Sequence, residues 1–225
     1  MYQLIEHNAD FVLVNKSPGI TVQAEDGVPG LLQRVAADLG LEKLYPVHRI
    51  DKMTSGLLIM AVTTDANRQL SELFRLREME KFYLAISDKK PRKKQGAVIG
   101  DMEKSRRGAW KLMPSRVNPA ISQFLSVSLK PGFRLFVIKP HTGKTHQIRV
   151  ALKSVAAAIV GDPLYHSRDD ADRGYLHAYS LRFNWRGEQR SYQCLPQQGE
   201  LFLAREFEAA LQPYRAPWAL DWPSL

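Results

Sequence analysis

Short apolar runs bounded by turn residues recur along the chain and predict β-strands. Residues 56–62 are almost wholly apolar, begin with Gly56 and are followed by Thr63-Thr64-Asp65, which is typical of a buried strand. Residues 121–129 and 133–139 alternate between apolar and polar positions around Lys130-Pro131-Gly132, which predicts a hairpin. Further strands are predicted at residues 11–16, 81–87, 156–160, 179–185 and 189–195.

Apolar residues spaced three and four apart predict helices between these strands. Residues 30–39 have this spacing. Residues 66–77 form an amphipathic pattern, for which Asp65 is the expected N-cap. Two more helices are expected, one capped by Thr145 and one at residues 203–211, before a loose aromatic tail. Hairpins mixed with scattered helices indicate an α+β fold with a largely antiparallel mixed sheet.

Length and composition are those of a soluble globular protein. The 225 residues are 44% hydrophobic and 24% charged, and the length suits one large domain or two small ones. We expect a single domain over residues 1–225, with a core at about 10–195 and a C-terminal helix and tail at about 200–225. No apolar run reaches ~18 residues and the N-terminus lacks a signal-peptide pattern, so no membrane span is expected and the cytoplasm is the expected compartment.

The positive charge is concentrated in residues 88–119. The net charge of the chain is +9, which favours a polyanionic partner. Two basic clusters lie in this segment: Lys89, Lys90, Arg92, Lys93 and Lys94, and then Lys104, Arg106, Arg107 and Lys111. We expect an exposed excursion in which residues 96–101 pair with residues 109–113 as a hairpin. Its clusters either follow the phosphates of a nucleic acid or form two solvated loops.

The sequence offers little to metal or thiol chemistry. Cys194 is the only cysteine, which excludes an internal disulfide and leaves a packed small side chain as its expected role. His141, His146 and Asp162 have no known zinc spacing. Gly143-Lys144-Thr145 lacks the first glycine of a phosphate-binding loop. No metal and no cofactor are therefore expected.

One carboxylate, Asp51, stands among basic and hydroxyl groups just before the strand at 56–62. A carboxylate beside cations keeps a low pKa and stays ionised, which suits a nucleophile. The alternative is a surface turn with a local pair between Arg49 and Asp51. Tyr83 shares a strand face with Lys81 and is either half-buried packing or a ring presented to a cleft.

Five sequence elements, in order from about residue 10 to 195, resemble the RluA-type pseudouridine synthases. The most specific is His48-Arg49-Ile50-Asp51 followed by Thr54-Ser55-Gly56. The others are Val14-Asn15-Lys16-Ser17-Pro18-Gly19, Lys81-Phe82-Tyr83, Thr142 to Val150, and Gly161-Asp162-Pro163-Leu164-Tyr165 with Leu176-His177-Ala178. The chain departs from the family pattern at Ile50, Lys52, Lys144, Ala151 and the shifted Pro18, none of which replaces Asp51. The small N-terminal RNA-binding domain of some relatives is not expected.

The resemblance implies a single catalytic domain that isomerises a uridine in RNA to pseudouridine, without redox change or metal. It implies that Asp51 is the nucleophile, attacking either the ribose or the base, and that Arg149 pairs with it. Tyr83 would stack on the uracil and help to remove the proton at C5. Because the target base lies in stacked RNA, the nucleotide must be flipped out.

The RNA contacts implied by the resemblance come from the loops of the domain. Arg49 would occupy the gap or hold the rearranged phosphate, Lys16 and His48 would line the cleft, and residues 88–119, with Arg106 and Arg107, would hold a stem. His146 is expected to be a structural hydrogen bonder, and Lys144 either contacts phosphate or is solvated. The substrate is a structured ribosomal or transfer RNA, and a monomer without an obligate protein partner is expected. The alternatives are a non-catalytic RNA-binding or RNA-folding protein on the same fold, and a basic coat protein.

Overall fold

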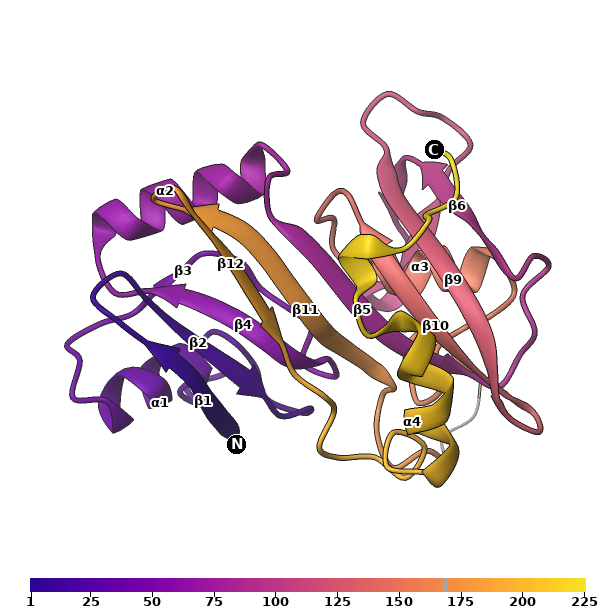
Figure 1. Cartoon of the computed structure of the whole chain (residues 1–225), viewed down its shortest axis with the longest axis horizontal. Coiled ribbons are helices and arrows are strands. Elements are labelled where there is room, and N and C mark those ends of the chain that lie inside the picture. Colours follow the sequence, from indigo (N-terminus) through magenta and orange to yellow (C-terminus); the bar gives the residue numbers. More distant parts are fainter. Residues whose placement is uncertain (168–169) are drawn as a thin grey trace. The chain divides into compact units, whose positions relative to one another are not determined.

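The computed structural model describes residues 1–167 and 170–225 and divides into two structural units (Figure 1). The first unit consists of residues 1–79 and 178–195. Its strands are ordered β1-β2-β4-β11-β12, with β3 also on β4. The bounds are β1 (Tyr2–His7), β2 (Phe11–Lys16), β3 (Tyr45–Pro46), β4 (Ser55–Ala61), β11 (Leu176–Trp185) and β12 (Glu188–Gln193). The division from the second unit falls inside β11, after His177.

Both faces of the central strands of this unit are covered. Every residue of β2 and of β4 is buried, as expected for strands packed on two sides. One face packs with Ala66 and Leu70 of α2 (Thr64–Arg75). The helix α1 (Leu31–Asp38) buries Leu31, Leu32, Val35 and Ala36. The core thus holds the strand that follows Asp51 rigidly in place.

The second unit, residues 80–177 and 196–225, is built on four antiparallel strands in the order β5-β10-β9-β6. Their bounds are β5 (Glu80–Ser87), β6 (Gln95–Gly100), β9 (Ala120–Lys130) and β10 (Phe133–Pro140). A separate hairpin joins β7 (Met102–Lys104) to β8 (Trp110–Leu112) around the short turn η1 (Arg106–Gly108). The helical elements are α3 (Gln147–Ser154), α4 (Arg205–Leu211), η2 (Gln212–Tyr214) and η3 (Pro217–Ala219).

The predicted α+β class with a mostly antiparallel sheet is confirmed. The predicted strands at 11–16, 56–62, 81–87, 121–129, 133–139, 179–185 and 189–195 are confirmed within one or two residues at most ends. The four predicted helices are confirmed with shifted ends. The described part of the chain has no helix that is long and apolar enough to cross a membrane.

One predicted strand pairing and one predicted strand are wrong. Residues 96–101 do not form a hairpin with residues 109–113: β6 pairs with residues 120–125 at the start of β9, and β8 pairs with β7, although Met113 N donates to Asp101 O at 2.8 Å. Residues 156–160 do not form a strand, because Ala156 has a φ of 64° and the segment makes only scattered backbone bonds, such as Val160 N to Ile86 O at 2.9 Å. Their apolar character instead reflects burial of residues 157–160.

The predicted loose tail is also wrong. In the second unit Trp222 stacks on Phe82 with ring centroids 6.0 Å apart, and its indole N–H donates to Pro217 O at 2.9 Å. The Gln123 amide donates to Pro223 O. Trp222 therefore packs against the face of β5 that carries Phe82, and Pro223 is bound to β9.

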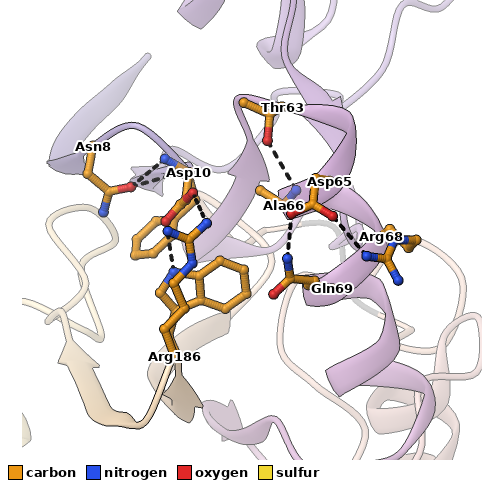
Figure 2. Close-up of polar contacts among 10 residues, drawn as sticks. Asn8, Asp10, Thr63, Asp65, Ala66, Arg68, Gln69 and Arg186 are labelled. Carbon is orange, nitrogen blue, oxygen red and sulfur yellow. Dashed lines mark hydrogen bonds and ion pairs between the residues drawn. The ribbon is translucent and has the colours of Figure 1, made fainter.

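The predicted helix caps need correction as well. The side chain of Thr63 caps α2 by accepting the Ala66 N–H at 3.1 Å, while Asp65 lies inside the helix and binds Arg68 and Gln69 (Figure 2). At α3 the N-cap is His146 rather than Thr145, and no side chain caps this end. Thr63 has the extended backbone that is usual for an N-cap, whereas His146 has a left-handed backbone.

Replacing Thr63 with alanine is expected to destabilise the protein by about 1 kcal/mol, because the Ala66 N–H loses its acceptor. Urea unfolding would measure this. The matched control is Asp65→Asn, which removes the exposed charge pair with Arg68 but not the cap, and should leave the unfolding midpoint unchanged. Equal effects of the two substitutions would contradict the assignment of the cap.

Candidate active site

The loop that carries Asp51 is fastened to the sheet of the first unit by backbone contacts. The carbonyl oxygen of Lys52 accepts from Gly19 N at 2.7 Å and from the ammonium of Lys16 at 3.3 Å. The turn closes through Thr54 N, which donates to the backbone oxygen of Asp51 at 2.9 Å. Ile50, the residue before Asp51, is buried and anchors the loop, and Asp51 itself is half-buried. The carboxylate therefore stands on a preorganised loop.

Lys16 has a different role from the predicted contact with RNA. Its side chain is 0% exposed, and its ammonium also donates to the carbonyl oxygens of Ser17 at 2.9 Å and Ile20 at 2.8 Å. A buried ammonium held by carbonyl groups cannot reach a phosphate in this conformation. Lys16 instead joins the end of β2 to the Asp51 loop.

His48 fixes the other side of this loop. Its Nε2 accepts the backbone N–H of Ile59 at 3.2 Å, and its ring stacks on Phe74 at 4.5 Å between centroids. These contacts give His48 a structural role in addition to any lining of a cleft. Arg49, by contrast, is exposed and available to a ligand.

Gly56 begins β4 at a place where no side chain fits. Its φ is 109°, and a Cβ atom there would lie 2.2 Å from the carbonyl oxygen of Ala178. The close approach of these two backbones in the first unit explains why the Thr54-Ser55-Gly56 sequence ends in glycine. Thr54 and Ser55, next to it, are buried.

Tyr83 lies in the middle of β5 in the second unit, opposite Ile138 of β10. It is half-buried, while Phe82 and Leu84 on the other face are completely buried. Lys81 shares the face of Tyr83, two positions away, and burial lowers the pKa of its ammonium to about 8. This strand face therefore combines a partly accessible ring with a cation that loses its proton readily.

Arg149 is held by a buried carboxylate that the sequence analysis missed. Its Nε and Nη2 donate to Asp162 at 2.7 and 2.8 Å, and the two side chains are 5% and 0% exposed. Asp162 also accepts the backbone N–H groups of Leu164 and Tyr165. The Arg149 guanidinium carbon lies 5.1 Å from the centroid of the Tyr165 ring. Two groups thus fix the orientation of this arginine.

Gln147 organises the turn before α3 and was likewise missed. Its side-chain oxygen accepts from Thr142 Oγ1 at 2.6 Å and Lys144 N at 3.0 Å, and its amide donates to Ile121 O at 3.0 Å and Ser122 Oγ at 2.9 Å. A glutamine that begins an otherwise apolar helix face was the available signal. Its four bonds join the turn before α3 to the start of β9.

The remaining predicted residues of the second unit have varied surroundings. Lys144 is half-exposed and donates to Asn118 Oδ1 at 2.8 Å. Arg106 and Arg107 are exposed at the turn between β7 and β8, where Arg107 has a φ of 55°. His146 is within 3.0 Å of the Tyr165 hydroxyl, as expected for a structural hydrogen bonder. Arg106 and Arg107 therefore lie outside the core, on the surface of the unit.

Other candidate chemistry is not supported among the described residues. No group of three or more His, Cys, Asp and Glu side chains there could hold a metal ion. Cys194 is buried, burial raises the pKa of its thiol to about 12, and its packing confirms the predicted structural role. The predicted pair between Asp51 and Arg149 joins residues of different units and stays a prediction.

Comparison with known proteins gives one consistent family. Residues 10–154 match the family model described as RNA pseudouridylate synthase. A protein of Haemophilus influenzae, named an uncharacterized RNA pseudouridine synthase, is 46% identical over 94% of this chain and 95% of its own length. The dual-specificity RNA pseudouridine synthase RluA of Pasteurella multocida is 30% identical over 80% of this chain and 85% of its length. The solved structure of human RNA pseudouridylate synthase domain containing 1 has the same fold, with a TM-score of 0.76, 21% identity, and coverage of 96% of this chain and 95% of that one.

Proposed function

Since the chain belongs to the RluA-type family of RNA pseudouridine synthases and isomerises uridine to pseudouridine in RNA, we propose that its substrate is a structured ribosomal or transfer RNA and that Asp51 is the nucleophile. The observation that supports the assignment of Asp51 is that its loop is fixed to the sheet by backbone contacts. Backbone atoms of the loop are bound by Lys16 and Gly19, so the half-buried carboxylate is positioned before any substrate arrives.

The reaction requires one bond exchange and no net oxidation. The bond between N1 of uracil and C1′ of ribose breaks, the base turns, and C5 bonds to C1′, while C5 loses a proton and N1 gains one. Asp51 attacks the ribose or the base and is released at the end. In the proposal Arg149 pairs with Asp51 and aims its carboxylate, which suits a guanidinium already oriented by Asp162 and Tyr165.

Tyr83 is proposed to stack on the flipped uracil and to help in the removal of the C5 proton. Its half-buried position on β5 supports this role, because part of the residue remains accessible. Arg49, exposed beside Asp51, is proposed to occupy the place that the flipped nucleotide leaves.

The RNA stem is proposed to bind the exposed basic residues of the second unit. Lys89, Lys90, Arg92, Lys93 and Lys94 are exposed around the buried Pro91, whose neighbour Arg92 donates its N–H to Val155 O at 3.4 Å. Arg106 and Arg107 project from a second turn, and Lys144 is a further contact. For a substrate of this kind we propose a cytoplasmic location and a monomer without an obligate protein partner.

Mapping pseudouridines in ribosomal and transfer RNA from cells with and without this protein tests the substrate. Sites that disappear without the protein, and that return when the purified protein acts on the unmodified RNA, identify its target. Unchanged maps of both RNA classes would overturn the proposed substrate class while leaving the isomerase activity to be sought on other RNA.

Replacing Arg106 and Arg107 with glutamine is expected to make the plot of log affinity against log salt concentration less steep. The negative slope should decrease in magnitude by about 1.5, since each lost phosphate contact removes about 0.7–0.9. The same change is expected for Lys93 and Lys94. Binding titrations at several salt concentrations measure the slope. The control replaces Arg68 and Arg75 of α2, which pair with Asp65 and Glu72, and should leave the slope unchanged. An unchanged slope in the first two variants would identify both loops as solvated surface.

A further inference from the structure

Tyr165 stands at the centre of a small network in the second unit. Its side chain is buried, and its hydroxyl accepts the backbone N–H of Trp110 at 2.7 Å. The same hydroxyl is 3.0 Å from His146 Nδ1, and the two rings meet edge to face at 84°. The face of the Tyr165 ring carries the guanidinium of Arg149 at 5.1 Å. One side chain therefore contacts a hairpin, a helix start and the arginine.

The hairpin in this network is the one that carries Arg106 and Arg107. Trp110 is the first residue of β8 and pairs with Lys104 of β7, and the two strands form a sheet of their own. An isolated two-stranded hairpin is only marginally stable, so its contacts with the rest of the unit fix its position. The Tyr165 hydroxyl supplies one such contact through the backbone of Trp110.

His146, which contacts the Tyr165 hydroxyl from the start of α3, has a strained backbone. His146 has a φ of 57°, a left-handed conformation that is uncommon for residues other than glycine. This conformation places its imidazole against Tyr165 at the residue where α3 starts, three positions before Arg149. Asp162 binds both the Arg149 guanidinium and the Tyr165 N–H. Movement of Tyr165 would therefore change the position of the Arg149 guanidinium.

We propose that Tyr165 is a positioning residue that couples the seating of the basic β7–β8 hairpin on RNA to the orientation of Arg149. The inference rests on the proposed function, in which Arg106 and Arg107 bind RNA and Arg149 acts in the chemical step. RNA that fixes the hairpin also fixes Trp110 N–H, which holds the Tyr165 hydroxyl and keeps the ring beneath the guanidinium. Binding energy at the hairpin thereby favours the arrangement needed for reaction.

The test is a double-mutant cycle on single-turnover kinetics at saturating RNA. Tyr165→Phe keeps the ring below Arg149 and removes only the hydroxyl. We expect the rate constant to fall about 10-fold with little change in RNA affinity. In the wild-type background, replacing Arg106 and Arg107 with glutamine should lower both the affinity and the rate constant. In the Tyr165→Phe background the same replacement should lower only the affinity, because the hydrogen bond between Trp110 N–H and the Tyr165 hydroxyl is already absent.

The control is Tyr175→Phe. Tyr175 is also buried in this unit, and its hydroxyl likewise accepts a backbone N–H, that of Leu201 at 3.0 Å. Comparable destabilisation with an unchanged rate constant is expected there. If the effects of Tyr165→Phe and the arginine replacements on the rate constant simply multiply, the coupling is overturned while the RNA contact stands. If the arginine replacements leave RNA affinity unchanged, the hairpin is not an RNA contact, and the coupling fails together with that part of the proposed function.

Discussion

Asparagine in place of Asp51 is expected to reduce pseudouridine formation by about 10⁴-fold or more, without loss of folding or of RNA binding. The amide has the size of the carboxylate but is not a nucleophile. The loop should survive the change, because it is held through backbone atoms of Asp51 and Lys52 and through buried Ile50. Release of tritium from RNA labelled at C5 of uridine measures turnover, and urea unfolding with RNA titration measures the rest.

Asp65→Asn is the matched control for this experiment, since it removes an exposed carboxylate from the same unit and should leave turnover unchanged. Activity within a few-fold of wild type in Asp51→Asn would show that another group is the nucleophile. Loss of activity together with loss of folding would call for Asp51→Ser, which tests whether the loop tolerates a smaller side chain.

Asparagine in place of Asp162 is expected to destabilise the protein by about 3–5 kcal/mol, because it removes the buried carboxylate that binds the buried guanidinium of Arg149 through two hydrogen bonds. The activity should fall as well, since Arg149 loses a group that orients it. Urea unfolding gives the stability change. The double variant with Arg149→Met should recover part of that stability but not the activity, because removing both charges is less costly than removing one.

The control for the buried pair is the partly exposed pair between Glu80 and Lys139, at 2.9 Å. Glu80→Gln should cost about 1 kcal/mol or less, since water still solvates these charges. A cost for Asp162→Asn as small as that of Glu80→Gln would mean that the Arg149–Asp162 pair contributes little to the fold.

Strand positions could be predicted from the sequence because burial on a sheet leaves a local apolar pattern. The pairing of strands could not, as residues 96–101 show: their partner is the first half of β9, residues 120–125, rather than the nearer segment 109–113, and no local apolar pattern distinguishes these two partners. Caps failed for a similar reason. Thr63 and Asp65 both carry an acceptor near the start of α2, and only the backbone conformation at Thr63 decides between them.

The candidate residues were found in sequence by their chemistry, but their surroundings were not. Lys16 looked like a cation at the end of a strand, but its ammonium is held by the carbonyl groups of Ser17 and Ile20 in the following turn and of Lys52, 36 residues away. Asp162 and Arg149 are 13 residues apart, with no periodic pattern to connect them. Contacts of this type follow from the path of the backbone, which composition and spacing do not encode.

The C-terminal segment has a practical consequence for anyone who handles this protein. Trp222 rests on Phe82, and Phe82 is the neighbour of Tyr83 on β5, with Pro223 bound to Gln123 just beyond. A purification tag joined after Leu225 would start two residues from these contacts. A label at this end therefore lies close to residues that support the back of the strand presenting Tyr83, and the activity of the protein labelled there should be compared with that of a protein labelled elsewhere.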